Sequence, residues 1–465
     1  MEHNRETLIS SAIAQAARGA RSALAVAAAL VVLWSFAHVL ARPMREADAR
    51  GDRTEIVLLH WGNREEAAVV QSLVESFERA NPDIRIKRIN ASANYFPKLQ
   101  TMLASGDPPD VFYLNAYHLP KYVPQGVVMP VDELLERDAA AGTLPFDPED
   151  RIPEPWAGFR FDGQRLGSGP LYGLPMSFTP MGFYYNENLF RAAGVPLPTS
   201  DWTWDDFEHA ARAVAEATGA RTAVDLRGAQ LLRLMLWNEG ADLTDPLFRT
   251  VAPADDPSVR AVIERLSSWR DAPSVFRLFG AAEESVETSA GMFQAGAAAM
   301  QGPVGRWMVP NYREIESFEW GWAPLPRGSA PPRNMLYVLA FCIARDTEHP
   351  EAAWRVAKHF ASPEGQEINS SLGLALPTLE SLAHNRPSGN EHRLPRNDQV
   401  FFEAARGAAP MLFPTESRAA KAMQNAAFEM FSSGRASPER ALARLQGELD
   451  AVHRSRLAGD FPPMP

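Results

Sequence analysis

The feature that most constrains the fold is a strand, a helix and a second strand in close succession near residue 60. Residues 56–59 are a continuous apolar run, which is typical of a strand buried on both faces. Residues 64–79 carry apolar side chains at helical spacing, and residues 84–86 resume as a strand after an Asn81-Pro82-Asp83 turn. Two strands joined by a helix within about 35 residues predict a parallel sheet flanked by helices.

The same alternation continues along the chain. Residues 95–105 have a helical pattern that Gly106 ends, and residues 110–114 are a second buried strand. The apolar run "MLYVLAFCIA" (335–344) indicates another strand late in the chain. We therefore expect an α/β protein rather than an all-helical one.

The rest of the second half is expected to be mainly helical. Helical patterning runs from about Trp204 through Trp237, again across residues 257–270, and through the final third to about His453. Residues 385–398 are polar, contain two prolines and show no periodicity, so we predict a loop there between lobe segments.

Length and charge limit the class of protein. With 465 residues the chain is too long for one ordinary core, which predicts two lobes plus an N-terminal extension. Its 46% apolar residues can bury a large core and exclude a disordered chain. A net charge of −11 without a Lys/Arg-rich block excludes a nucleic-acid partner, since such binding needs a basic face.

Cysteine usage and motif content argue against metal or covalent chemistry. Cys342 is the only cysteine and lies in an apolar run, so we expect a buried, inert side chain. One thiol can form neither an internal disulfide nor a cysteine metal cluster. The H-E-x-x-H, G-x-S-x-G and phosphate-cradling glycine motifs are absent from the sequence. We expect no metal, no cofactor and no catalytic residues.

An apolar stretch near the N-terminus predicts export. Residues 23–41 are interrupted only by Ser35 and His38 and are preceded by Arg18 and Arg21. A helix of this length spans roughly 28 Å, just enough for a bilayer core of about 30 Å. The stretch is therefore either a cleaved signal or an uncleaved transmembrane anchor. Residues 42–53 would form a short tether.

Six segments taken in order resemble the extracellular solute-binding proteins of ATP-driven (ABC-type) sugar importers, the family that includes maltose-binding protein. They lie within roughly residues 55–380, and the fourth and second are the most specific. The segments are "FERANPDIRI" (77–86), "KLQTMLASGDPPDVFYLN" (98–115), "VPQGVVMPVDELL" (123–135), "LYGLPMSFTPMGFYYNENLFRAAGVPLPTSDWTWDDF" (171–207), "FQAGAAAMQGPVGRW" (293–307) and "EAAWRVAKHFASPEGQ" (351–366).

The resemblance implies an α/β, two-lobe periplasmic-binding-protein fold of the type II-like class, preceded by the signal or anchor helix. Lobe 1 is expected at residues 54–177 plus about 328–384, and lobe 2 at residues 178–327 plus about 385–465. Crossing strands would join the lobes, ligand would lie between them, and binding would close the hinge.

Strand-end loops supply the first site candidates, because ligands in open α/β sheets meet the carboxyl ends of strands. Trp61 could present a flat apolar face to the C–H surface of a sugar ring, and Asn63 could bond hydroxyls with both donors and acceptors. The alternative is that Trp61 packs on the lobe surface.

The resemblance extends the candidate set to other loops. It places Tyr113, Asn115 and Tyr117 at the end of the strand at 110–114, and Phe178 and Thr179 at the first crossing between lobes. Thr179 stands where maltose binders place a ligand carboxylate, which is consistent with a neutral ligand.

The second lobe contributes the remaining candidates. The resemblance makes Trp307 the stacking aromatic opposite Trp61, with Arg306 beside it either bonding hydroxyls or solvated. Asn334 and Tyr337 flank the late strand that returns to the first lobe. By contrast, Tyr184 and Tyr185 are expected to pack inside a strand.

These residues predict an exported binding protein, periplasmic or at the outer face of the membrane. It would act as a monomer, capture a neutral sugar or oligosaccharide, and deliver it to the membrane permease subunits of an importer. Another cargo (glycerol phosphate, a polyamine or iron) stays open. An exported carbohydrate-active enzyme is the rival from another class, and it would need two acids across the scissile bond. Three acids lie near the candidate loops, where helix-start or surface roles are usual: Glu65, Glu66 and Glu187.

Overall fold

The computed structural model describes most of the chain beyond residue 52. The described residues are 53–218, 223–245, 248–279, 291–371, 373–384, 395, 399–410, 417–432 and 434–457. Of the described residues, 55–81 and those from 86 onward form one compact unit, and residues 53–54 and 82–85 belong to a second, small unit. The predicted export stretch (23–41), the tether up to residue 52 and nearly all of the predicted loop at 385–398 lie outside the described residues. No helix in the described part has the length and apolar character needed to span a bilayer.

The first sheet has six strands and carries the predicted strand–helix–strand unit. Its strands are β1 (Thr54–His60), β2 (Ile84–Asn90), β3 (Val111–Asn115), β6 (Leu174–Pro180), β12 (Met335–Ile343) and β13 (Ala409–Pro410). The order is β13-β12-β3-β1-β2, and β6 also pairs with β12. β1 and β3 are parallel, with Leu58 opposite Val111, whereas β12 is antiparallel to both β3 and β6. The parallel pair β1–β3 agrees with the predicted parallel sheet, and the antiparallel strand β12 makes the sheet mixed.

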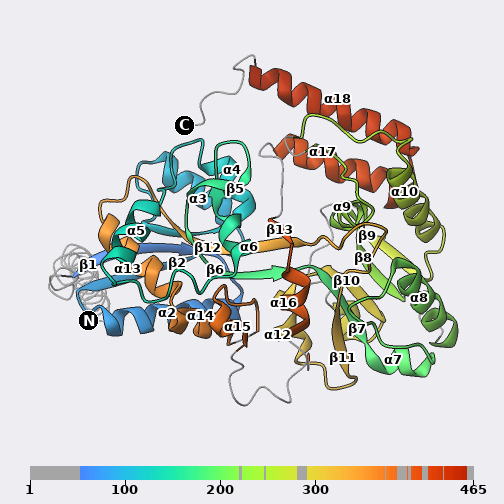
Figure 1. Ribbon diagram of the computed structural model, residues 1–465, viewed down its shortest axis with the longest axis horizontal. Coiled ribbons are helices and arrows are strands. Elements are labelled where there is room, and N and C mark those ends of the chain that lie inside the picture. Colours follow the sequence, from blue (N-terminus) through green and yellow to red (C-terminus); the bar gives the residue numbers. More distant parts are fainter. Residues whose placement is uncertain are drawn as a thin grey trace, which may run out of the picture. The chain divides into compact units, whose positions relative to one another are not determined.

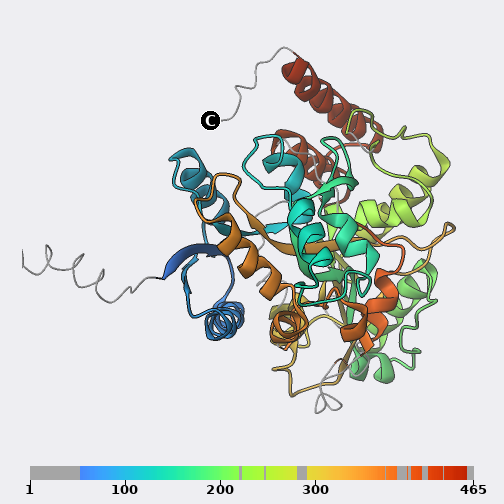
Figure 2. The same ribbon diagram turned by 60° about the vertical axis from the view of Figure 1, so that its left-hand side comes forward.

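Helices cover the first sheet with the apolar faces that the sequence predicts. α2 (Arg64–Ala80) buries Val70, Leu73 and Phe77, and α3 (Tyr95–Ala104) buries Leu99. α14 (Pro363–Ser370) lies beside α2 although nearly 300 residues separate them, as both views show (Figures 1 and 2). The other elements of this region are α4 (Leu119–Tyr122), α5 (Asp132–Ala140), α6 (Pro153–Gly158), α13 (Pro350–Phe360), α15 (Glu380–His384), β4 (Arg160–Phe161), β5 (Leu166–Leu171) and the 3-10 turn η1 (Ala116–His118).

The second sheet has five strands in the order β11-β7-β10-β8-β9. β10, β8 and β9 run parallel to one another, while β7 is antiparallel to β10 and β11. The strands are β7 (Gly182–Asn186), β8 (Val224–Arg227), β9 (Phe276–Phe279), β10 (Met300–Val304) and β11 (Trp320–Pro324). Tyr184 and Tyr185 are buried in β7, which confirms that they pack inside a strand.

A second core surrounds this sheet. It joins apolar side chains of the sheet to those of α8, α9, α10, α17 and α18. The helical elements of this region are α7 (Glu187–Ala192), α8 (Trp204–Thr218), α9 (Gly228–Asn238), α10 (Pro257–Arg270), η2 (Arg306–Met308), α12 (Val309–Tyr312), α16 (Gln399–Ala405), α17 (Ser417–Ala427), η3 (Phe428–Ser432) and α18 (Pro438–Leu457).

One part of the predicted secondary structure is wrong. The region from Trp204 through Trp237 is not continuously helical, because the strand β8 separates α8 from α9. The apolar residues Val224 and Leu226 of β8 are fully buried between β10 and β9. Sheet pairing therefore overrides the helical tendency of the flanking segments.

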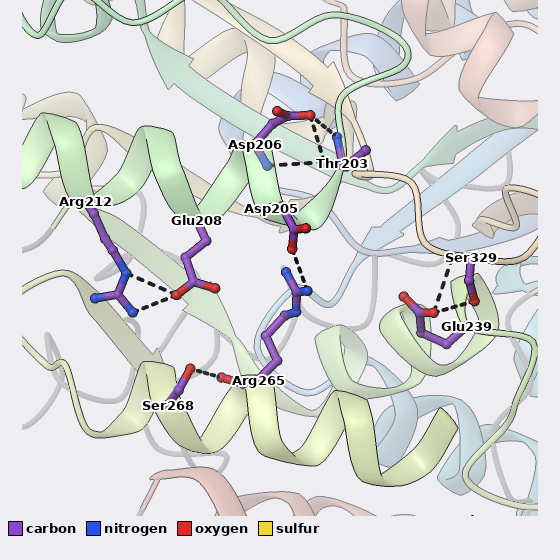
Figure 3. A network of polar contacts seen from close by, with 9 residues as sticks. All are labelled: Thr203, Asp205, Asp206, Glu208, Arg212, Glu239, Arg265, Ser268 and Ser329. Carbon is purple, nitrogen blue, oxygen red and sulfur yellow. Dashed lines mark hydrogen bonds and ion pairs between the residues drawn. The ribbon is translucent and has the colours of Figure 1, made fainter. Parts of the chain in front are cut away.

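Polar contacts fix the start of α8 and attach it to α10. The Thr203 N–H donates to Asp206 Oδ2 at 2.8 Å, and the Asp206 N–H donates back to Thr203 Oγ1 at 3.2 Å, which is a reciprocal helix cap. Arg265 of α10 pairs with Asp205 at 2.6 Å (Figure 3). Figure 3 also shows the Ser329 hydroxyl bonded to Glu239 at the end of α9. These carboxylates cap helices of the second lobe or join them to neighbouring segments.

The chain crosses between the two sheets with few intervening residues. Only Met181 separates β6 of the first sheet from β7 of the second. The return passage, from β11 to β12, takes residues 325–334. Short crossings of this kind give the two-lobe α/β fold that the sequence predicts. The precise lobe boundaries stay predictions.

Candidate functional site

The candidate site lies at the carboxyl ends of parallel strands in both sheets. Trp61 follows β1, and Tyr117 follows β3, its parallel neighbour. In the second sheet, Trp307 follows β10 and Gln230 follows the parallel strand β8. Carboxyl ends of parallel strands meet at one edge of a sheet, where ligands of open α/β proteins bind.

Six rings form a continuous series of contacts from Trp61 to Trp307, which we call the aromatic row. The centroid distances between successive rings are 6.1, 4.2, 4.3, 5.9 and 5.2 Å, so each ring contacts the next. Its members, in order, are Trp61, Phe96, His118, Tyr117, Tyr337 and Trp307. Although Tyr117 and Tyr337 belong to first-sheet segments, both pack against the core of the second lobe. The structure therefore connects the two predicted tryptophans.

Trp61 is held firmly at its end of the row. Its ring also makes edge contacts with Tyr95 at 4.7 Å and Tyr113 at 5.0 Å. The Tyr95 hydroxyl donates to the Tyr113 carbonyl at 2.5 Å, and both rings are buried. Burial raises the pKa of Tyr113 far above its ordinary value, so its hydroxyl stays protonated. Trp61 is partly buried, and its packing and its predicted stacking role are compatible.

Asn63, predicted to bond ligand hydroxyls, caps the helix α2. Its side-chain oxygen accepts the Glu66 N–H at 2.9 Å, and Glu66 Oε2 accepts the Asn63 N–H at 2.8 Å. This capping box uses the acceptor that the prediction assigned to a ligand. Glu66 is thereby bound to the helix start, and Glu65 lies in the same first turn.

Two histidines near the row are kept neutral by burial. His60 ends β1, is fully buried, and its Nδ1–H donates to the Trp61 carbonyl at 2.9 Å. Burial lowers its pKa to about 4, and the nearby charge of Arg88 contributes to the lowering. His118, inside the row, has its pKa lowered to about 3, mainly by burial and also by Lys121. Both rings therefore act as uncharged aromatic groups at neutral pH.

Amide side chains pair with two tyrosine hydroxyls of the row. Asn115 Nδ2 donates to Tyr117 Oη at 3.4 Å, and Gln230 Nε2 donates to Tyr337 Oη at 3.2 Å. Burial raises the pKa of Tyr117 to about 12, so its hydroxyl is neutral. These pairs place polar atoms that both donate and accept beside flat apolar rings.

Thr179, Arg306 and Trp307 come together at the end of β10. The Arg306 N–H donates to Thr179 Oγ1 at 2.7 Å, which joins the first crossing segment to the second lobe. A Cβ built on Gly305 would lie 2.1 Å from the Trp307 ring and 2.8 Å from the Thr179 methyl, so only glycine fits there. The Trp307 ring thus packs directly on the chain that precedes it.

The Arg306 guanidinium points to other partners. It lies over the Phe401 ring of α16, with its central carbon 5.5 Å from the ring centroid, and Nη1 donates to the Ala375 carbonyl at 3.4 Å. Its side chain is buried rather than solvated. The alternative of a surface charge is therefore wrong, and a role in bonding a ligand stays a prediction.

Asn334 and Phe178 occupy structural positions. Asn334 Nδ2 donates to the Met181 carbonyl at 2.9 Å, and its Oδ1 accepts the N–H groups of Met181 at 3.1 Å and Met335 at 2.7 Å. The Asn334 carbonyl accepts the Ala409 N–H at 3.0 Å, so this residue ties the crossings together. Phe178 is buried in β6 against Phe402. Cys342 is also buried, as predicted.

Sequence reasoning missed Phe96, His118 and Gln230. Phe96 and His118 were overlooked because the first turn of α3 and the 3-10 turn η1, not strand ends, carry them. Gln230 was hidden by the wrong assignment of β8 as helix. The signal for it was the run "AVDLRG" (223–228), an alternating apolar segment that ends in glycine.

The candidate acids lie at the starts of helices. Glu187 lies in the first turn of α7, where it pairs with Arg191 at 2.5 Å. Within the described residues, no group of three or more His, Cys, Asp or Glu side chains could hold a metal ion. The arrangement presents flat rings, amides and hydroxyls, which is chemistry for holding a ligand.

Comparison with known proteins finds relatives among binding proteins. The sn-glycerol-3-phosphate-binding periplasmic protein UgpB of Salmonella paratyphi A is 24% identical over 365 residues, which cover 74% of this chain and 79% of the relative.

Among solved structures, an ABC substrate-binding protein of Listeria monocytogenes in complex with cycloalternan superposes with a TM-score of 0.72 at 22% identity, covering 86% of this chain and 99% of its own. UgpB of Mycobacterium tuberculosis in complex with glycerophosphocholine reaches 0.70 at 17% identity, covering 87% and 99%. At these identities the structural likeness establishes the fold.

The family is established by a match over most of the sequence. The sequence model of the bacterial extracellular solute-binding proteins matches residues 61–367, more than half of the chain. The matched range runs from Trp61 past Trp307, so it includes the whole aromatic row. This chain belongs to the bacterial extracellular solute-binding protein family.

Proposed function

We propose that this protein is the substrate-binding component of an ABC-type importer and that it captures a neutral sugar or oligosaccharide. The observation that carries the proposal is the aromatic row, which joins Trp61 at the end of β1 to Trp307 at the end of β10. Flat rings pack on the C–H faces of sugar rings, and neighbouring amides and hydroxyls bond the sugar hydroxyls.

The charge around the row supports an uncharged ligand. His118, a member of the row, and His60, which precedes Trp61, are both neutral because burial lowers their pKa values. The Arg306 guanidinium is directed to Phe401 and to a backbone carbonyl. Lys121 and Arg88 lie close enough to contribute to these lowered pKa values, so the preference for a hydroxyl-rich neutral molecule over a phosphate rests on the rings and amides of the row.

Ligand titration tests the proposal. Tryptophan fluorescence and calorimetry are followed while monosaccharides, disaccharides and longer oligosaccharides are added to the purified protein. Saturable binding of at least one sugar is expected, with a fluorescence change because Trp61 and Trp307 belong to the row. No heat and no spectral change across a broad panel would reject the sugar proposal.

Glycerol phosphate and its esters are the second candidate ligands. The similarity to UgpB of Salmonella paratyphi A favours them, because that relative's name states that it binds sn-glycerol 3-phosphate. The same calorimetric titration with sn-glycerol 3-phosphate and glycerophosphocholine separates the two ligand classes. Binding of these compounds without binding of sugars would select the second candidate.

The proposed function includes membrane permease subunits as partners and delivery from outside the cytoplasmic membrane. We expect a monomer that closes by hinge rotation, with ligand shifting the population toward the closed form.

Residues 23–41 would serve as a signal or an anchor. N-terminal mass analysis of the protein from its native cells distinguishes cleavage from anchoring. An enzyme would instead turn over a chromogenic glycoside, and we expect no turnover.

A further inference from the structure

Gln230 lies where a ligand-contacting residue of the second lobe is expected. It belongs to the first turn of α9, three residues after β8 ends at Arg227. β8 runs parallel to β10, which leads to Trp307 at the same edge of the sheet. Gln230 therefore shares with Trp307 the edge at which open α/β sheets bind ligands.

A hydrogen bond orients the Gln230 side chain toward the aromatic row. Its Nε2 donates to Tyr337 Oη at 3.2 Å, and the Tyr337 ring contacts both neighbours in the row, Tyr117 at 5.9 Å and Trp307 at 5.2 Å. A carboxamide has two donor hydrogens and an acceptor oxygen, and this bond uses one donor. Gln230 is partly exposed, so solvent or a ligand reaches it.

A matching arrangement exists on the first lobe. Asn115 Nδ2 donates to Tyr117 Oη at 3.4 Å, and Asn115 is also partly exposed. The two amide–tyrosine pairs come from different sheets and meet through the Tyr117–Tyr337 ring contact. One neutral amide thus stands on each side of the two central tyrosines.

We propose that Gln230 is a specificity-determining residue that bonds a hydroxyl of the ligand from the second lobe. The inference rests on the proposed function and adds a residue and a selection rule to it. A carboxamide offers a donor hydrogen and an acceptor oxygen and carries no charge, so it suits a hydroxylated ligand whose hydroxyls both donate and accept. A ligand that lacks this hydroxyl leaves the amide unpaired and binds more weakly.

The test uses whichever sugar of the panel the wild-type protein binds. Gln230→Leu keeps the approximate shape and removes the hydrogen bonds, and it is expected to weaken calorimetric binding roughly 10- to 100-fold. Gln230→Glu adds a carboxylate, and its binding should recover as pH falls and the carboxyl is protonated. The matched control is Gln71→Leu on the exposed face of α2, where the Gln71 side chain donates to Glu75 at 2.9 Å, and no change is expected.

A double substitution separates ligand contact from positioning of Tyr337. Gln230→Leu in a Tyr337→Phe background should weaken binding further, because contact with ligand does not need the tyrosine hydroxyl. No further loss in that background would overturn the proposal, as would Gln230→Leu binding within about twofold of wild type. If Gln230→Leu fails to fold by circular dichroism, Gln230→Asn replaces it and is judged by the same criteria.

The outcomes also separate this inference from the function on which it rests. Sugar binding by the wild type together with unchanged binding by Gln230→Leu would reject only the role of Gln230. Absence of binding to every sugar by the wild type would reject the proposed function and this inference together.

Discussion

The carboxyl edges of the two sheets present similar side chains but hold them differently. At the first sheet, Trp61 contacts three further rings, and its neighbours His60 and Asn63 serve the buried core and a helix cap. At the second sheet, Trp307 meets Tyr337, which Gln230 holds by a hydrogen bond. Trp61 is held by several packed rings, whereas Trp307, which also packs on Gly305, contacts a tyrosine that a polar pair orients. Substitutions at the first edge should therefore lower stability, and those at the second should lower affinity.

The largest loss of stability is expected at Asn334, where the chain crosses between the two sheets. Asn334→Ala should lower the free energy of unfolding by about 4 kcal/mol, because it leaves the buried N–H and carbonyl of Met181 without partners. Urea denaturation measures this loss. The control Asn311→Ala, at an exposed position of α12, should change stability by less than about 0.5 kcal/mol. Equal effects of the two substitutions would contradict the structural role of the Asn334 side chain, which is to hold the Met181 backbone by hydrogen bonds.

Trp61→Ala tests the packing of the rings around Trp61. We expect a loss of about 3 kcal/mol in unfolding free energy, at the low end for a truncated tryptophan because the ring is partly exposed. Trp307→Ala should lose clearly less stability while weakening sugar binding at least as much. The comparison of the two edges fails if Trp307→Ala is the more destabilising variant in urea denaturation.

The pH dependence of stability tests the buried residue His60, which precedes Trp61. His60 has a folded-state pKa of about 4, below its ordinary value of 6.5, so the unfolded chain binds the proton more readily. Stability is fully present above pH 6.5 and falls as the pH drops toward 4. Between pH 6.5 and 4.5 the loss due to His60 should be about 2 kcal/mol.

A variant assigns that loss to His60. His60→Leu should remove about 2 kcal/mol of the pH dependence, measured as urea midpoints at pH 7 and pH 4.5. His118, whose pKa is lowered to about 3, contributes the same pH dependence to the wild type and to His60→Leu, so its contribution cancels when the two proteins are compared. An unchanged pH profile in His60→Leu would show that this ring titrates in the folded protein as it does in the unfolded one.

The smallest effect is expected at the exposed end of the first edge. Asn63→Ala removes the capping acceptor of α2 and should cost about 1 kcal/mol of stability. Sugar binding should stay within about threefold of wild type, since the side-chain oxygen already bonds to Glu66. A large loss of affinity with unchanged stability would restore the predicted ligand role of Asn63.

Particular elements show how far sequence reasoning reached. β1, α2 and β3 were predicted because uninterrupted apolar runs and one-sided helical spacing are local signals of burial. β8 was missed because its four residues lie between two helices and its burial depends on β10 and β9. Asn334 was predicted to lie near the site, but its structural role was missed because its side chain bonds to Met181, 153 positions away.

The sequence alone determined the α/β alternation, the family resemblance and the aromatic and amide types available at strand ends, because these follow from local apolar periodicity and turn residues. Only the tertiary structure decided which of those side chains meet. It joined Trp61 to Trp307 through four other rings, assigned Asn63 and Asn334 to the backbone, and brought Gln230 to Tyr337. The physical reason is that a side chain's partner is set by long-range strand pairing and packing, which place residues far apart in the chain within hydrogen-bond distance.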